Sequence, residues 1–219
     1  KSVDTINRYA AQITGFLLKK NVKLLIVACN TMAAVALPTI KDLSNVPVLE
    51  VIDASARYAV AQTCVKAIGV IGTPATINSN AYARAIRLLN RKVKIFSQAC
   101  PLFVPLVEEG WLDHRATKLI AREYLKPLLA EKIDTLVLGC THYPLLKPLL
   151  QQIVGRRVTL IDSAEAMAEM TADLIEKQKI GNSSQREPDY PFYVSDVPYR
   201  FQAIGEKFLG RKFGRVEVV

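Results

Sequence analysis

Short runs of apolar, mostly β-branched or leucine residues alternate along this chain with longer segments of helical periodicity. Strands are predicted over residues 24–27, 47–52, 68–71, 93–96, 136–138, 158–161 and 192–194, and helices over 3–17, 77–89, 113–129, 144–153, 164–178 and 199–208. A short run at 215–219 ends the chain. The first six strand runs are apolar at nearly every position, which is typical of sheets covered by helices on both faces. The pattern therefore predicts an α/β fold with mostly parallel sheets.

Two segments of the chain repeat the same order of residue types. Residues 24–31 read LLIVACNT and residues 135–142 read TLVLGCTH. Each is followed by a helical pattern and then by a second strand ending in Ile-Asp, at 52–53 and 161–162. The repeat predicts two pseudo-symmetric lobes, residues 1–48 with 166–219 and residues 49–165, with the active site in the cleft between them.

Cysteine usage and charge limit the classes of function. The four cysteines, at 29, 64, 100 and 140, form no Cys-x-x-Cys pair, so reduced thiols and a cytoplasmic location are predicted. No apolar run is long enough to span a membrane. The net charge of +9 is spread along the chain without a basic tract, which favours a solvated surface that attracts anionic metabolites over a nucleic-acid interface.

Cys29 and Cys140 are candidate catalytic residues because each is predicted to lie where a buried strand gives way to a helix. The unpaired N–H groups and positive dipole end of the helix are expected to lower the thiol pKa from its usual value of about 8.5. Cys64 and Cys100 occupy no such position and are predicted to be buried core residues. Two facing thiols can move protons or electrons, and the lack of a close cysteine pair favours protons.

Polar residues follow both candidate thiols. Asn30, Thr31 and Thr141 can cap a helix or donate hydrogen bonds to a substrate carboxylate. His142, two residues after Cys140, is predicted to transfer protons or bind substrate. The other histidine, at position 114, is predicted to be solvated in the first turn of a helix.

The residues around both cysteines resemble the two signatures of bacterial glutamate racemases. ACNT at 28–31 matches the first signature, and GCTHYP at 139–144 matches the second, which is the more specific. The similarity runs over essentially the whole chain and includes TINRY at 5–9, GTPAT at 72–76, CPLFVPLVE at 100–108 and FYVSD at 192–196. Related aspartate racemases share the Cys-Thr core but typically carry Glu at the position of His142.

This resemblance implies interconversion of L- and D-glutamate without pyridoxal phosphate, metal or other cofactor, supplying D-glutamate for peptidoglycan. It implies that Cys29 deprotonates D-glutamate, that Cys140 deprotonates L-glutamate, and that His142 assists Cys140. Glu108 matches a family residue implicated in catalysis. The residues that would bind the substrate are Asn30, Thr31, Thr73, Thr76, Thr141 and His142.

The chain departs from the family at its front. Family members open with a strand carrying Asp-Ser-Gly and later have a Pro-Tyr-Gly turn, and by alignment both would precede Lys1. The resemblance therefore implies that several substrate contacts lie outside these 219 residues, and a protein made of these residues alone is expected to be inactive and poorly stable.

Other functions remain open at this stage. One is an aspartate or hydantoin racemase of the same superfamily, another an inactive truncated form with a binding role, and a third a thiol redox or metal protein using both cysteines. The implied partner is the small molecule glutamate. A homodimer is compatible with the family. Some family members affect DNA gyrase, and the positive charge of this chain is compatible with gyrase or nucleic acid as a partner, but no motif indicates one.

Overall fold

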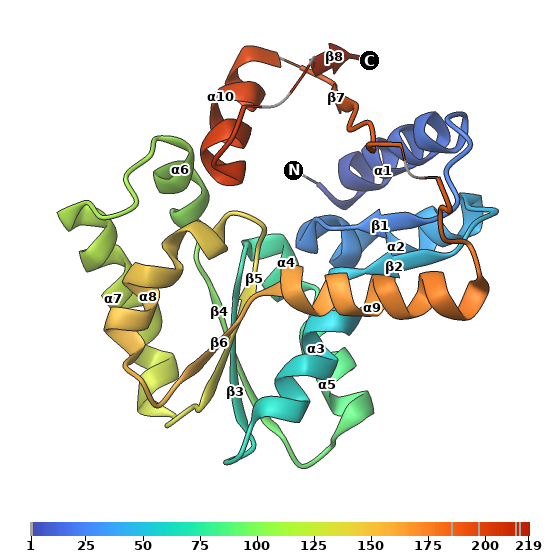
Figure 1. Ribbon diagram of the computed structural model, residues 1–219. Helices are drawn as coiled ribbons and strands as arrows, with labels where there is room; N and C mark the ends of the chain where they lie inside the picture. The colour runs from blue at the N-terminus through green and yellow to red at the C-terminus, as the bar shows by residue number, and fades with distance from the viewer. Residues whose placement is uncertain (1, 185, 197, 213, 215) are drawn as a thin grey trace. The chain divides into compact units, whose positions relative to one another are not determined.

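The computed structural model describes residues 2–184, 186–196, 198–212, 214 and 216–219. The chain divides into two compact units, the first ending at Ile180 and the second beginning at Gly181. The first unit contains both cysteine signatures and most of the helices and strands (Figure 1). In the described part of the chain no helix is long and apolar enough to cross a membrane.

Two parallel sheets form the framework of the first unit. The smaller pairs β1 with β2, and the larger has the order β4-β3-β5-β6. The strands are β1 Leu25–Val27, β2 Val48–Glu50, β3 Ala67–Gly72, β4 Lys94–Ala99, β5 Thr135–Gly139 and β6 Thr159–Ile161. Every one of these pairings is parallel, so the predicted α/β class with parallel sheets is confirmed, and all strand carboxyl ends within a sheet lie at one edge.

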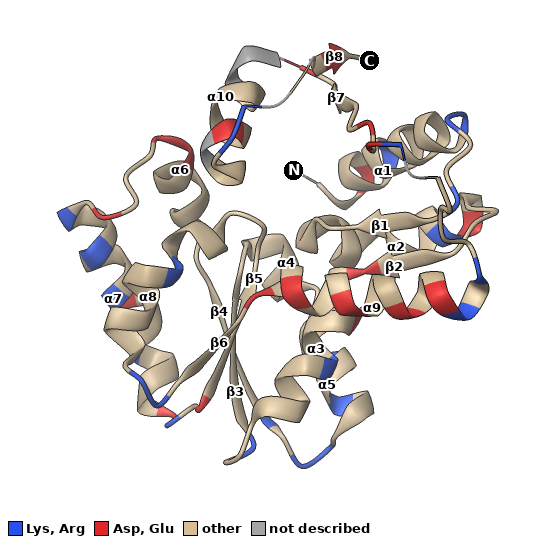
Figure 2. Cartoon of the chain, in the orientation of Figure 1, with Lys and Arg blue, Asp and Glu red and all other residues tan. Residues whose placement is uncertain are grey.

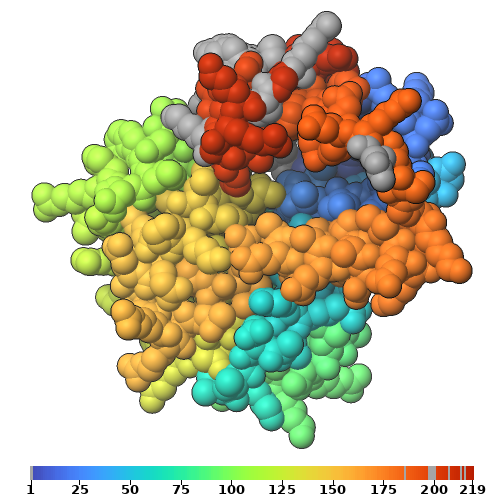
Figure 3. All heavy atoms as spheres, in the orientation of Figure 1, coloured from blue at the N-terminus to red at the C-terminus, as the bar shows by residue number. Residues whose placement is uncertain are grey.

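Helices connect successive strands and cover the sheets. They are α1 Val3–Leu18, α2 Asn30–Leu43, α3 Val51–Gln62, α4 Pro74–Asn78, α5 Ala81–Leu89, α6 Phe103–Glu108, α7 Arg115–Ala130, the 3₁₀ turn η1 Tyr143–Leu146, α8 Lys147–Val154 and α9 Ser163–Gln178. Helix α9 packs against α3, and the two lie side by side in the space-filling view (Figure 3). Lys and Arg are scattered over many helices and loops and are not gathered in one tract, as the sequence predicted (Figure 2).

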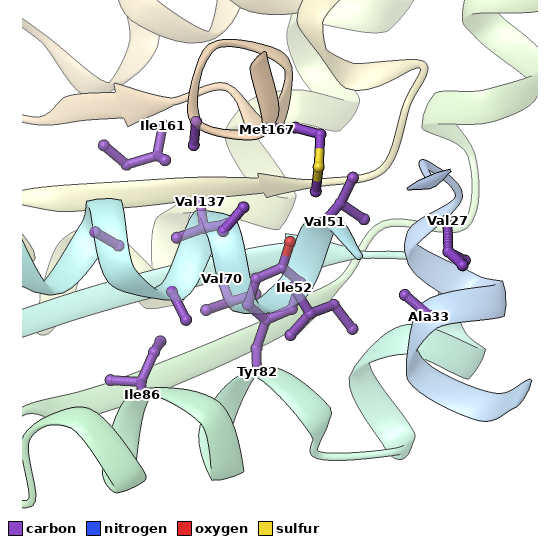
Figure 4. Packing of buried hydrophobic residues seen from close by; sticks show 14 of the residues in the cluster. Val27, Ala33, Val51, Ile52, Val70, Tyr82, Ile86, Val137, Ile161 and Met167 are labelled. Atoms are coloured by element: carbon purple, nitrogen blue, oxygen red, sulfur yellow. The ribbon is translucent and has the colours of Figure 1, made fainter. Parts of the chain in front are cut away.

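Alternate residues of the larger sheet enter two different hydrophobic clusters. Ile68 and Val70 of β3 pack in one cluster, whereas Ala67 and Ile71 pack in the other. The same division separates Val137 of β5 from its neighbours, because successive side chains of a strand point to opposite faces. The first cluster also contains residues of β1, β2 and α1, so one continuous core joins the two sheets (Figure 4).

The second unit contains a small parallel sheet and one helix. Strands β7 (Phe192–Val194) and β8 (Val216–Val218) pair in parallel, and α10 (Pro198–Leu209) lies between them in the sequence. The rings of Phe192 and Phe201 approach to 6.4 Å between centroids. The strand and helix predicted at 192–194 and 199–208 are therefore confirmed. Residue 215 of the terminal run lies outside the described residues.

Two of the differences from the predicted elements have a clear local cause. Strand β2 ends at Glu50, and Ile52 and Asp53 already belong to α3, because the Glu50 carboxylate accepts hydrogen bonds from both of their N–H groups and caps that helix. The predicted helix over 77–89 is two helices, since Asn80 adopts a left-handed conformation with φ of 56° between α4 and α5. The lobe boundaries drawn from the repeat stay a prediction.

The carboxylate of Asp134 fastens the start of β5 to the loop that precedes β3. It accepts hydrogen bonds from the N–H groups of Cys64 and Val65, both at 2.7 Å, and from the Thr63 hydroxyl at 2.6 Å. Burial acts to raise the pKa of Asp134, but the hydrogen bonds from Thr63, the loop backbone and Thr135 outweigh it, so this pKa lies below its ordinary value.

We expect Asp134→Asn to destabilise the protein by about 1 kcal/mol at pH 7, since an amide cannot accept this whole set of bonds and the carboxylate is partly solvated. A depressed folded-state pKa stabilises the protein above the unfolded-state value of about 3.9 and ceases to do so as the pH falls through the folded value. Urea unfolding of both proteins at pH 7 and below pH 4 should therefore give a difference that shrinks in acid.

Asp113→Asn is the matched control, because the Asp113 side chain is 80% exposed and pairs only with the surface residue Lys118 among the ion pairs identified in the described residues. This variant should change the free energy of unfolding little at either pH. An equally large loss for Asp113→Asn, or a pH-independent loss for Asp134→Asn, would contradict the role assigned to Asp134.

Candidate functional site

The polar residues that follow β1, β3 and β5 define the candidate site. Cys29 follows β1 as the N-cap residue of α2, Thr73 follows β3 as the N-cap residue of α4, and Cys140 directly follows β5. β3 and β5 are adjacent parallel strands, with Gly72 paired to Gly139, so Thr73 and Cys140 leave the sheet side by side. The carboxyl edge of an open parallel sheet is where ligands of α/β proteins bind.

Cys29 and Cys140 differ in environment. Cys29 is exposed, and its side chain makes no capping hydrogen bond to α2. Cys140 is only 6% exposed. Burial is the largest factor that raises the pKa of Cys140, and charge on Cys29 is a smaller one. The first signature reaches the turn beside Cys140, since Oγ1 of Thr31 lies 2.9 Å from Oγ1 of Thr73 and Gly72 pairs with Gly139.

The expectation of a lowered thiol pKa is wrong for Cys140. Burial raises this pKa to about 11, although N–H groups of His142 and Tyr143 and the Thr141 hydroxyl act in the opposite direction. The backbone donors predicted from the sequence are therefore present, but the loss of solvation outweighs them. At neutral pH Cys140 is a thiol and so a proton donor.

His142 lies between Cys140 and Glu108 and contacts both side chains. Nδ1 of His142 lies 3.9 Å from Sγ of Cys140, and Nε2 lies 3.3 Å from Oε1 of Glu108. An imidazole next to a thiol can accept a proton from it and return it, so this arrangement is suited to proton transfer. Glu108, which no residue pattern singled out, is placed here by helix α6.

Three threonine hydroxyls form a triangle between α2 and α4. Oγ1 of Thr31 lies 2.9 Å from Oγ1 of Thr73 and 3.3 Å from that of Thr76, and the latter two are 3.0 Å apart. Thr31 belongs to α2 beside the smaller sheet, Thr73 is the N-cap residue of α4, and Thr76 lies in α4. Such a group of hydroxyls can redirect hydrogen bonds to a carboxylate. Thr141 is exposed, with its hydroxyl 3.4 Å from Nδ1 of His142.

Asn30 is buried behind Cys29, and its partner was not predicted. Its Oδ1 accepts a hydrogen bond of 2.6 Å from the hydroxyl of Tyr82, which is 3% exposed in α5. A tyrosine at an inward helical position has the same sequence pattern as an ordinary core residue, so no sequence signal distinguishes Tyr82. Only the fold places α5 next to the start of α2.

Of the two remaining cysteines, Cys64 precedes β3, whereas Cys100 directly follows β4 at the same edge of the larger sheet as Thr73. Cys100 is buried as predicted, and burial raises its thiol pKa far above the ordinary value. Cys64 is exposed in the loop before β3, so the prediction of a buried residue is wrong there. Among the residues that the structure describes, no group of three His, Cys, Asp or Glu side chains is arranged to hold a metal ion.

Comparisons with known proteins agree with this geometry. The family model for Asp/Glu/Hydantoin racemase matches residues 2–171. A glutamate racemase of Syntrophus aciditrophicus is 65% identical over 219 residues, covering 100% of this chain and 81% of that protein. Two solved structures are similar over 100% of this chain. The Francisella tularensis glutamate racemase in complex with D-glutamate has 39% identity and a TM-score of 0.93, with 81% of that chain covered. A Bacillus anthracis glutamate racemase isoform has 36% identity and a TM-score of 0.95, with 82% of that chain covered. The chain therefore belongs to the Asp/Glu/hydantoin racemase family of isomerases, in which its relatives are glutamate racemases.

Proposed function

We propose that this protein interconverts L- and D-glutamate, with Cys29 and Cys140 as the acid and base on opposite faces of the substrate. The observation that carries the proposal is the set of contacts between the two cysteine signatures. Thr31 bonds to Thr73 beside the end of β5, and Tyr82, which donates to Asn30, lies against Gly139. Racemisation requires a base on one face of the α-carbon and an acid on the other, and two equivalent thiols meet this requirement. The relatives named glutamate racemase support the choice of substrate.

The reaction begins with removal of the α-proton by one thiolate. The electron pair of the Cα–H bond stays on the α-carbon and is delocalised into the adjacent carboxylate, and the thiol on the opposite face then gives its proton to that carbon. For L-glutamate, Cys140 is the base, so its thiol has to lose its proton first. His142, 3.9 Å from the sulfur and paired with Glu108, is suited to take that proton.

The hydroxyl triangle and Asn30 hold the substrate in this proposal. Thr31, Thr73 and Thr76 donate to a carboxylate, and the Thr141 hydroxyl beside His142 donates on the Cys140 side. The α-proton is a very weak acid, so hydrogen bonds to the carboxylate that strengthen as charge develops must supply much of the barrier reduction. We assign the D-glutamate product to peptidoglycan synthesis and assign no cofactor to the reaction.

A purified full-length protein is expected to bring the circular dichroism signal of either L- or D-glutamate to zero without added cofactor, because the two enantiomers have equal free energy. L-Aspartate under the same conditions should keep its signal, since its side-chain carboxylate lies one methylene nearer the α-carbon. Loss of signal from aspartate in preference to glutamate would favour the related aspartate racemase activity, and no change with either amino acid would contradict the proposal.

A further inference from the structure

Tyr82 places a hydroxyl group inside the continuous apolar core. It lies in the first turn of α5 and packs in the same cluster as Val70 and Val137 of the larger sheet. Its side chain points away from α5 and into that cluster (Figure 4). Removing a phenol hydroxyl from water is costly unless the hydroxyl is hydrogen-bonded, so the partner of Tyr82 has to explain why a phenylalanine does not occupy this position.

The hydroxyl of Tyr82 interacts with Ser55 and donates to the residue directly after Cys29. The Tyr82 hydroxyl donates to Oδ1 of Asn30 at 2.6 Å, and Asn30 is 2% exposed. Nδ2 of Asn30 is buried and has no hydrogen-bond partner among the residues that the structure describes. Because the carboxamide is planar, holding Oδ1 also determines the direction in which Nδ2 points. Leaving a buried donor unpaired is costly, and a ligand that accepts its hydrogen bond would remove that cost.

The same tyrosine contacts the second signature. A Cβ atom built on Gly139, the residue before Cys140, would lie 3.1 Å from Cε2 of Tyr82. Burial raises the pKa of Tyr82; a hydrogen bond with Ser55 acts against this, and the charges of Glu50 and Cys140 add to it. Tyr82 therefore stays protonated and remains a donor while Cys140 changes its charge. One side chain thus touches the neighbours of both thiols.

We propose that Tyr82 is a positioning residue, which holds the Asn30 carboxamide so that Nδ2 donates a hydrogen bond to the glutamate bound between the two thiols. This role rests on the proposed function, because it needs an anionic substrate at that place. Tyr82 itself does not touch the substrate. Without its hydroxyl the amide of Asn30 is free to rotate, and a rotated amide presents an acceptor where the substrate needs a donor.

Tyr82→Phe keeps the ring and removes only the hydroxyl. In the full-length protein we expect KM for both enantiomers to rise about tenfold while kcat changes less than about twofold, because a contact made equally in the ground and transition states affects binding alone. Thr117→Val is the matched control. It also removes one hydroxyl of a fully buried residue, which donates to the Trp111 carbonyl at 2.6 Å, but it does so in α7. The Thr117→Val variant should lose about as much thermal stability as Tyr82→Phe, but its KM for glutamate should equal that of the wild type.

A double-mutant cycle distinguishes positioning from a general structural role. Asn30→Ala should raise KM at least as much as Tyr82→Phe, and adding Tyr82→Phe to Asn30→Ala should raise it no further. Independent, multiplying effects, an unchanged KM in either single variant, or an equal rise in Thr117→Val would each overturn the role of Tyr82. A wild-type protein that neither racemises nor binds glutamate would overturn the proposed function together with this inference, whereas an active wild type with an unaltered Tyr82→Phe overturns the inference alone.

Discussion

Replacing either Cys29 or Cys140 with serine is expected to abolish most glutamate racemisation, with a loss of about 100- to 10,000-fold in kcat. A serine hydroxyl keeps the size of the side chain but is a far weaker acid and so cannot supply the thiolate base. Since racemisation needs both faces of the α-carbon, each single variant should lose activity in both directions. The measurement is the rate of loss of circular dichroism from L- and from D-glutamate.

Elimination from 3-chloroglutamate separates the two thiols, because it needs only one base. The base removes the α-proton, chloride leaves the β-carbon, and the resulting enamine hydrolyses to a keto acid and ammonia. Cys29→Ser, which retains Cys140, should still eliminate chloride from the L-configured analogue, and Cys140→Ser from the D-configured one. Each variant is thus the control of the other. Racemisation at the wild-type rate in either variant would contradict the two-thiol mechanism.

Gly139→Ala is expected to destabilise the protein by about 3 kcal/mol, at the upper end of the cost of overpacking a core. A Cβ there would lie 2.6 Å from the carbonyl oxygen of Ile71 and 3.1 Å from Cε2 of Tyr82. The Ile71 carbonyl cannot move aside without disturbing the pairing of β3 with β5, and Tyr82 is held by its bond to Asn30. For a chain of this size the loss corresponds to about 6–12 °C in Tm, measured by calorimetry.

Gly15→Ala is the control for this substitution. Gly15 lies in the interior of α1, and a Cβ there would have no atom within 4 Å. Replacing a helical glycine with alanine is expected to stabilise the protein by about 0.5–1 kcal/mol, because it restricts the unfolded chain. A Tm for Gly139→Ala equal to that of the wild type would mean that β3 and β5 move apart more easily than their packing implies.

Most of the strands were predictable because a strand buried on both faces of a sheet has apolar residues at nearly every position. The apolar runs that became β3 and β5 are buried at every position. The errors arose where a side chain or a backbone conformation overrides the local pattern. Glu50 ends β2 by capping α3, and Asn80 divides one predicted helix into two. Neither effect is visible in hydrophobic periodicity.

The residues of the candidate site stay a prediction from the sequence, whereas the electrostatics around Cys140 differ from those predicted. Cys140 and His142 lie together after β5, with 3.9 Å between Sγ and Nδ1. The pKa of Cys140 was predicted in the wrong direction, because the helix amino terminus is a local feature whereas burial depends on the whole fold. Glu108 was known only through the resemblance, and its contact with His142 comes from the placement of α6.

By itself the sequence determined the class of this protein: parallel α/β, with a repeated strand–cysteine unit and the polar residues that follow each thiol. These are local properties, written in the periodicity and order of neighbouring residues. Only the tertiary structure decided which residues work together. Tyr82 meets Asn30 from 52 positions away in the chain, and a single core shared by both sheets places it against the neighbour of the second thiol as well. Such contacts depend on packing between elements, which no short stretch of sequence records.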